Sequence, residues 1–256
     1  MSSLSDLDRI RAALDAAAAA LRALSPLRVA VEYKAGGDPV TDADRAVDSL
    51  LRSVLLGPGE GWLSEETEDD PRRLACRRVW IVDPLDGTRQ FLEGIPEWCV
   101  SVALVEDGEA VAGGTCNPAT GQTFLGHLAA GAWLNGRPVR VSDRAAVAGA
   151  RVLASRSESK RGEWLRFRDA PFEVRATGSV AYKLSLVAAG LADATWSFVP
   201  KHEWDVAAGV ALVRSAGGTV RPLGGVLAFN RPVPRVPGLL AAPPSLAESF
   251  AVLLGA

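Results

Sequence analysis

A strand-like stretch that ends in two carboxylates is the feature that most constrains this chain. Val79 to Val82 is an apolar run typical of a buried strand. Asp83 and Asp86 follow, and because Pro84 between them has no N–H and a fixed φ, the strand is predicted to stop there. The Gly87-Thr88 pair then adds a turn and a hydroxyl group. Such a strand end suits a divalent cation and a phosphate, although an ordinary surface turn is the competing interpretation.

Acidic residues stand at three other predicted element ends. A short strand over Trp62–Ser64 runs into Glu65, and helices are predicted to begin near Asp44 and Asp205. Thr41 and Asp44 also fit a helix-capping pair, and an aspartate in a first helical turn suits the helix dipole. Both helix-start acids therefore have a structural as well as a functional interpretation.

Five acids at element ends raise an electrostatic question; they are Asp44, Glu65, Asp83, Asp86 and Asp205. Such a group could not stay ionised in one pocket without cations, because like charges raise each other's pKa. The acids are therefore either scattered or metal-binding. All-oxygen ligands favour Mg²⁺ over Zn²⁺, which prefers histidine or cysteine.

The order of predicted elements indicates a mixed fold class. A first helix is expected from Ser5 to about Leu24, a hairpin with its turn at 106–109 dominates the middle, and strands and helices alternate in the second half. We therefore predict an α+β part over residues 1–143 and an α/β part over 144–256, packed tightly as one functional unit. The charged stretch from Glu68 to Arg73 is expected to be an exposed loop.

Composition limits the partners of this chain. A formal net charge of -2 over 256 residues gives no reason to expect a nucleic-acid polymer or a membrane as partner. No apolar run approaches a transmembrane length, and no signal peptide is recognised, so a cytoplasmic protein is expected. The basic cluster from Arg156 to Arg168 is either a solvated face or a phosphate grip. The oligomeric state is open, with a homodimer as one option.

Two motifs resemble the signatures of the inositol monophosphatase superfamily: Trp80–Thr88 and Trp204–Gly209. The segments Val40–Asp44 and Leu63–Glu66 and the helix stop at Gly217-Gly218 fall in the matching order, so the resemblance covers nearly the whole chain. It implies a layered α-β-α-β-α sugar-phosphatase fold, similar to inositol monophosphatase and fructose bisphosphatase. It also implies Mg²⁺-dependent hydrolysis of a small-molecule phosphate ester, commonly inhibited by Li⁺.

The resemblance implies a set of metal ligands. Glu65, Asp83 and the Leu85 carbonyl would bind a first Mg²⁺. Asp83, Asp86 and Asp205 would bind a second, and Glu65 would also touch a third, weaker site. Two or three Mg²⁺ ions are therefore expected at one site.

The resemblance also implies catalytic and phosphate-binding residues. The amides of Gly87 and Thr88 would hold the phosphate. Thr88, hydrogen-bonded to Asp44, would help to orient and deprotonate the attacking water, and Glu65 would complete the catalytic set. A catalytically inactive member acting as a binding protein is disfavoured, because no expected metal ligand is missing.

The sequence indicates the substrate less clearly than it indicates the reaction. Inositol phosphatases usually carry a glutamate where this chain has Phe198, and Ser155-Arg156-Ser157 resembles a segment of bisphosphate nucleotidases. Lys183 replaces a common asparagine and could meet a second phosphate. These positions favour hydrolysis of the 3′-phosphate of 3′-phosphoadenosine 5′-phosphate, with Ser155 and Lys183 as substrate-binding residues. Gly94-Ile95-Pro96 instead looks like inositol phosphatases, so the alternative is an inositol-1-monophosphatase or a broad sugar-phosphate phosphatase.

Overall fold

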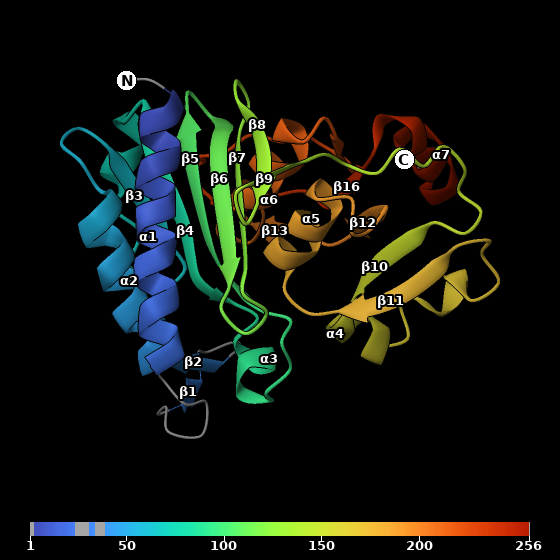
Figure 1. Cartoon of the computed structure of the whole chain (residues 1–256), viewed down its shortest axis with the longest axis horizontal. Coiled ribbons are helices and arrows are strands. Elements are labelled where there is room, and N and C mark those ends of the chain that lie inside the picture. The colour runs from blue at the N-terminus through green and yellow to red at the C-terminus, as the bar shows by residue number, and fades with distance from the viewer. Residues whose placement is uncertain (1–2, 24–30, 34–38, 256) are drawn as a thin grey trace.

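The chain folds into alternating layers of helices and sheets (Figure 1). The computed structural model describes residues 3–23, 31–33 and 39–255. In the described residues, helices α1 (Ser3–Ala23) and α2 (Asp42–Leu55) pack on one face of a seven-stranded sheet. Helices α5 (Val180–Ala188) and α6 (Glu203–Ser215) lie between that sheet and a five-stranded one, and α7 (Pro244–Leu254) covers the far side of the five-stranded sheet. This arrangement confirms the predicted α-β-α-β-α layers. The division at residues 143 and 144 stays a prediction.

The elements have the following bounds. The seven-stranded sheet has the order β3 (Gly61–Ser64), β4 (Arg78–Asp86), β5 (Cys99–Glu106), β6 (Glu109–Asn117), β7 (Gln122–His127), β8 (Gly131–Leu134), β9 (Arg137–Val139). The five-stranded sheet has the order β11 (Glu173–Thr177), β10 (Arg151–Ser155), β12 (Ala194–Ser197), β16 (Leu239–Ala242), β14 (Thr219–Pro222). Two small sheets pair β1 (Val31–Tyr33) with β2 (Pro39–Thr41), and β13 (Lys201–His202) with β15 (Arg235–Val236).

The helices fill the layers between and outside the sheets. The longer ones are α1 (Ser3–Ala23), α2 (Asp42–Leu55), α5 (Val180–Ala188), α6 (Glu203–Ser215) and α7 (Pro244–Leu254). The short ones are α3 (Thr88–Leu92), α4 (Arg156–Lys160) and the 3₁₀ turns η2 (Pro71–Ala75) and η3 (Leu165–Phe167). The predicted end of the first helix, Leu24, lies outside the described residues. None of the helices in the described part of the chain is long and apolar enough to cross a membrane.

Strand alternation decides which face of the large sheet receives the carboxylates. Along β4, Trp80 packs with the α1 and α2 core, whereas Ile81 packs with the α5 and α6 core. Side chains two positions apart share a face, so Asp83 follows Ile81 to the side that α6 covers. In β3, Leu63 belongs to the same core and directs Glu65 to the same side. Because β3 and β4 run parallel, both acids emerge at one edge.

The prediction that the strand stops at Pro84 is wrong, since β4 continues to Asp86. The register with β5 is regular as far as Asp83 and resumes at Asp86, with an irregularity between them. On the other side, pairing with β3 ends at Val82. Pro84 therefore sits where neither neighbouring strand needs its missing N–H, the situation in which strands tolerate proline.

The prediction of an exposed loop from Glu68 to Arg73 is also wrong at its end. Pro71–Ala75 forms the turn η2, with Asp70 as its N-cap, and Arg73 is only 2% exposed. The stretch looks exposed in sequence because it is almost entirely charged. Its buried arginine is paired with Asp69 and also with groups far away in the chain, such as Asn230, which local patterning cannot reveal.

Two paired glycines of the large sheet face helix α6 and allow it to approach closely. Gly113 of β6 is opposite Gly126 of β7. A Cβ on Gly113 would lie 2.7 Å from the Ala208 carbonyl oxygen, whereas a Cβ on Gly126 would meet only side-chain atoms of Leu212 and Ser215 at 3.1 Å and beyond. The backbone contact at Gly113 therefore sets the height of α6 above the sheet.

We predict that Gly113→Ala lowers the free energy of unfolding by about 1–3 kcal/mol, because helix backbone must move to admit the methyl group. Gly126→Ala is the matched control and should cost less, since side chains can yield. Urea denaturation of both variants measures the difference. Equal losses in the two variants would contradict a special role for the backbone contact.

Candidate active site

Three carboxylates from three different elements meet at the sheet edge. They belong to Glu65 after β3, Asp83 in β4 and Asp205 in the first turn of α6. Each offers a ligand oxygen, and these oxygens lie within 4.8 Å of one another. Oxygen ligands at such separations are what a hard divalent cation needs.

The electrostatics of this cluster fit the same conclusion. Burial and the neighbouring Glu65, Asp86 and Asp205 raise the pKa of Asp83 well above its ordinary value. Burial and the charges of Asp86 and Glu65 raise the pKa of Asp205 to about 8. Acids that resist ionisation in the protein alone become favourable ligands once a cation supplies the counter-charge. The donor set therefore fits Mg²⁺.

Asp86, the last residue of β4, lines the same cleft as these three acids, and its side chain also caps the start of helix α5. Its Oδ2 atom accepts hydrogen bonds from the Ser179 hydroxyl and the Ala181 N–H, each 2.7 Å long. Ser179 in turn accepts from the Tyr182 N–H at 2.9 Å and has an unusual positive φ of 54°. Sequence reasoning missed this role of Ser179, although a Gly-Ser pair before a helix was its visible signal.

Thr88 and Asp44 are brought together across 44 positions of sequence. The Thr88 hydroxyl lies 3.2 Å from Asp44 Oδ1 and 3.0 Å from the Leu85 carbonyl oxygen. The other oxygen, Oδ2, accepts from the N–H of Thr41 at 2.8 Å and from its hydroxyl at 2.5 Å. The capping pair and the contact with Thr88 therefore coexist in one carboxylate, whose pKa is raised chiefly by burial.

Gly87 allows the chain to turn from β4 into α3. Its φ is +98°, and a Cβ would lie 3.0 Å from Trp98 Cβ and 3.1 Å from the Glu97 carbonyl oxygen. A residue with a side chain would therefore be strained on both counts. The turn places Gly87 and Thr88 at the wall of the same cleft as the acids.

The cleft has a volume of about 510 Å³ and collects the predicted residues. Nine of them line it: Glu65, Asp83, Leu85, Asp86, Gly87, Thr88, Ser155, Lys183 and Asp205. Asp44 is not among the lining residues and reaches the cleft through Thr88. Phe198 is not among them either, and the Arg166 guanidinium covers its ring at 4.1 Å.

The basic cluster predicted from Arg156 to Arg168 contributes only part of itself to the cleft. Arg156 and Arg161 line it. Arg156 is bound to Glu97 by hydrogen bonds of 2.6 and 3.0 Å, and the same Glu97 oxygen accepts the Gly178 N–H at 2.8 Å. Ser155 caps the short helix α4 by accepting the Glu158 N–H at 3.4 Å. Arg156 thus ties two walls of the cleft together.

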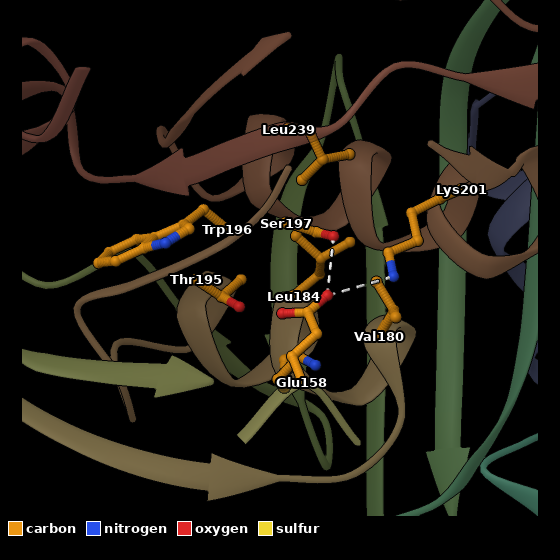
Figure 2. Close-up of a pocket in the computed structure, with 9 residues that line it drawn as sticks. Glu158, Val180, Leu184, Thr195, Trp196, Ser197, Lys201 and Leu239 are labelled. Carbon is orange, nitrogen blue, oxygen red and sulfur yellow. Dashed lines mark hydrogen bonds and ion pairs between the residues drawn. The ribbon is translucent and has the colours of Figure 1, made fainter. Parts of the chain in front are cut away.

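A buried acid and two lysines line another part of the same cleft. Figure 2 shows the Glu158 carboxylate between Ser197 and Lys201, at 3.1 Å from the Ser197 hydroxyl and 3.7 Å from the Lys201 Nζ atom. Lys183 lines the same small pocket and is 4% exposed. Burial and the charge of Lys201 lower the pKa of Lys183 to about 8. Sequence reasoning found Lys183 but missed Glu158 and Lys201, whose proximity is purely tertiary.

Comparisons with known proteins agree with this geometry. The model of the "Inositol monophosphatase family" matches residues 4–254. An inositol-1-monophosphatase of Rhizobium meliloti is 39% identical over 197 residues, which is 73% of each protein. The extragenic suppressor protein SuhB of Bartonella henselae has a TM-score of 0.84 at 30% identity, covering 99% of this chain and 98% of that one.

A third comparison is with another solved structure of the same family. CysQ of Bacteroides thetaiotaomicron, described as a bacterial member of the inositol monophosphatase family, has a TM-score of 0.76 at 26% identity. The match covers 93% of this chain and 97% of CysQ. The fold, the acidic cluster and the family model lead to one conclusion: the chain belongs to the inositol monophosphatase family of phosphatases.

Proposed function

We propose that this protein is a Mg²⁺-dependent phosphomonoesterase that acts on inositol monophosphates or closely similar polyol phosphates. The observation that carries the reaction type is the meeting of Glu65, Asp83 and Asp205 within 4.8 Å in a cleft that Thr88 also lines. The substrate class is supported by the inositol-1-monophosphatase relative at 39% identity.

The acidic residues divide between two cation positions in this proposal. Glu65, Asp83 and the Leu85 carbonyl would hold one Mg²⁺, and Asp83, Asp86 and Asp205 would hold the second. Asp86 uses Oδ2 for the start of α5, and among the described residues its Oδ1 has no hydrogen-bond partner, so that oxygen faces no competition. Bound Mg²⁺ supplies positive charge that activates water and stabilises the attacking and leaving oxygens of an in-line displacement.

In this proposal, Thr88 and Asp44 accept the proton that the attacking water loses. The Thr88 hydroxyl orients the attacking water and passes its proton towards Asp44, with which it shares a 3.2 Å hydrogen bond. Burial raises the pKa of Asp44, which favours its acceptance of a proton. The amides of Gly87 and Thr88 would bind the phosphate oxygens, because donors at the start of a helical turn suit an anion.

A second candidate is the hydrolysis of 3′-phosphoadenosine 5′-phosphate. The observation in its favour is the pair of lysines, Lys183 and Lys201, that line the cleft together with the acids, since a second phosphate would need cations there. The similarity to CysQ at 26% identity is compatible with it. The curated inositol-phosphatase relatives nevertheless favour the inositol proposal, and Ser155 and Lys183 remain proposed substrate contacts in either case.

The substrate proposal is tested by parallel phosphate-release assays with Mg²⁺, with and without Li⁺. We expect kcat/KM for inositol 1-phosphate to exceed that for 3′-phosphoadenosine 5′-phosphate by about tenfold or more, the scale of one net hydrogen bond. Lys183→Met should lower turnover of the nucleotide more than that of inositol phosphate. A reversed preference would favour the nucleotidase candidate.

The metal proposal is tested with Asp83→Asn. We expect Mg²⁺-dependent turnover to fall by about 100-fold or more, because the ligand shared by both cation positions loses its charge. The metal-free variant should be at least as stable at pH 8 as the parent, since a buried, repelled carboxylate has been removed. Thermal unfolding with and without Mg²⁺ measures this, and turnover within tenfold of the parent would refute the assignment.

The acids also predict a pH dependence for the metal-free protein. In the folded state the pKa of Asp205 is about 8, above its ordinary 3.8, so the folded protein binds the extra proton between those values. This contribution to stability is therefore complete below about pH 4 and is lost as the pH rises through about 8. Urea unfolding in EDTA from about pH 5 to about pH 8 should show a decline that Asp205→Asn lessens. A flat parent profile would contradict the prediction.

A further inference from the structure

A buried arginine outside the cleft connects two of the segments that carry metal ligands. Arg73 of η2 is 2% exposed and does not line the cleft. Burying a guanidinium is costly unless its donors are all satisfied. Here the partners are Asp69, Asn230 and the Arg231 carbonyl, at distances between 2.6 and 2.9 Å.

On one side, Arg73 fastens the segment that carries Glu65. Asp69 lies in the loop that follows Glu65, and its two carboxylate oxygens accept from Arg73 Nε at 2.6 Å and Nη2 at 2.8 Å. The first residue of β3, Gly61, packs so closely that a Cβ there would lie 2.9 Å from Arg73 Cβ. Arg73 therefore contacts the β3 segment before and after Glu65.

On the other side, Arg73 reaches the start of α6 through Asn230. Arg73 Nη1 donates to Asn230 Oδ1 at 2.7 Å, and Asn230 Nδ2 donates back to the Arg73 carbonyl at 3.1 Å. The main-chain N–H groups of Asn230 and Arg231 donate to the two oxygens of Glu203 at 2.7 and 2.9 Å. Glu203 is the first residue of α6, is 0% exposed and precedes Asp205 by two positions.

We propose that the set Asp69, Arg73, Asn230 and Glu203, here called the Arg73 network, is a positioning device for the metal centre. It holds the Glu65 and Asp205 segments at the separation that a cation requires. Stability alone does not explain it, because buried ion networks are often no more stabilising than well-packed apolar side chains. Mg²⁺, by contrast, demands nearly ideal ligand geometry, and groups behind the ligands commonly tune affinity.

Glu203 itself is not a ligand in this proposal. It does not line the cleft, and both of its oxygens are taken by main-chain N–H groups. Its charge faces the 230–231 turn and, through that turn, Arg73. The network therefore acts on metal binding only through the placement of Asp205 and Glu65, which separates its effect from that of losing a ligand.

Two mild variants test the network. Asn230→Gly removes both side-chain contacts with Arg73 while keeping the main-chain N–H and the positive φ of 56° that glycine accepts. Glu203→Gln keeps the size of the side chain but leaves one N–H without its acceptor. We expect each to weaken Mg²⁺ binding by about tenfold, measured by isothermal titration calorimetry, and to raise the half-saturating Mg²⁺ in catalysis equally. Saturating Mg²⁺ should restore kcat to near the parent value.

Asp193→Asn is the matched control for lost stability. Asp193 is likewise buried, accepts the Arg151 N–H at 2.7 Å and lies outside the cleft lining. It should lower the unfolding temperature but leave Mg²⁺ affinity unchanged. If Asn230→Gly and Glu203→Gln behave like Asp193→Asn, the positioning role is overturned.

The inference rests on the proposed Mg²⁺-dependent function, and the two can fail separately. Parent protein that binds Mg²⁺ normally alongside unaffected network variants would overturn the network alone. Parent protein that binds no Mg²⁺ in calorimetry would overturn both. Parent protein that binds Mg²⁺, with weakened variants, but hydrolyses neither phosphate ester would leave the positioning role supported and refute the proposed reaction.

Discussion

Mutual repulsion among buried carboxylates is the constraint on which the rest of this structure depends. Burial and the nearby charges of Glu65 and Asp86 raise the pKa values of both Asp83 and Asp205, which favours their neutral forms. A fold that brings such groups together must obtain the necessary free energy elsewhere. The close approach of α6 to Gly113 and the buried contacts around Glu203 are two places where packing and hydrogen bonding hold the acids in place.

Helix capping and chemistry use different oxygens of the same side chains. In Asp44, Oδ2 accepts a hydrogen bond from Thr41 and Oδ1 accepts one from Thr88. In Asp205, Oδ2 accepts a hydrogen bond from the His202 N–H at 2.9 Å. Asp86 likewise gives Oδ2 to the start of α5. Because a carboxylate has two oxygens, one can anchor the backbone while the other is available to a cation or, in Asp44, to Thr88. The structural and functional interpretations of these acids are therefore compatible.

The parts of the site that could be predicted from sequence are those at element ends. Strand and helix patterns located Glu65, Asp83 and Asp205, and strand alternation explains why Glu65 and Asp83 share the face that α6, the helix carrying Asp205, covers. The prediction failed at Pro84, because tolerance of proline there depends on where β3 and β5 stop pairing. Where the neighbouring strands stop pairing depends on the tertiary arrangement of the sheet, which the sequence of β4 alone does not reveal.

Charged residues with distant partners were the second kind of failure. Arg73 looked like part of an exposed loop because its neighbours are charged, yet its partners include Asn230, 157 positions away. Glu158 and Lys201 pair between α4 and β13 for the same tertiary reason. No periodicity marks these contacts, since a single buried polar residue leaves no pattern along the chain.

The charge balance of the cleft wall that carries Lys183, Lys201 and Arg156 bears on which phosphate ester the site accepts. Lys201 is offset by Glu158, Arg156 by Glu97 and Arg161 by Glu163. Lys183 is also on this wall, and the charges that raise its pKa against the effect of burial include Asp86 as well as Glu158. A lysine that already serves as counter-charge to the acidic cluster needs no second substrate phosphate to justify its burial. The wall is thus closer to neutral than its count of basic residues suggests, which supports the proposal of an uncharged polyol over that of a second phosphate group.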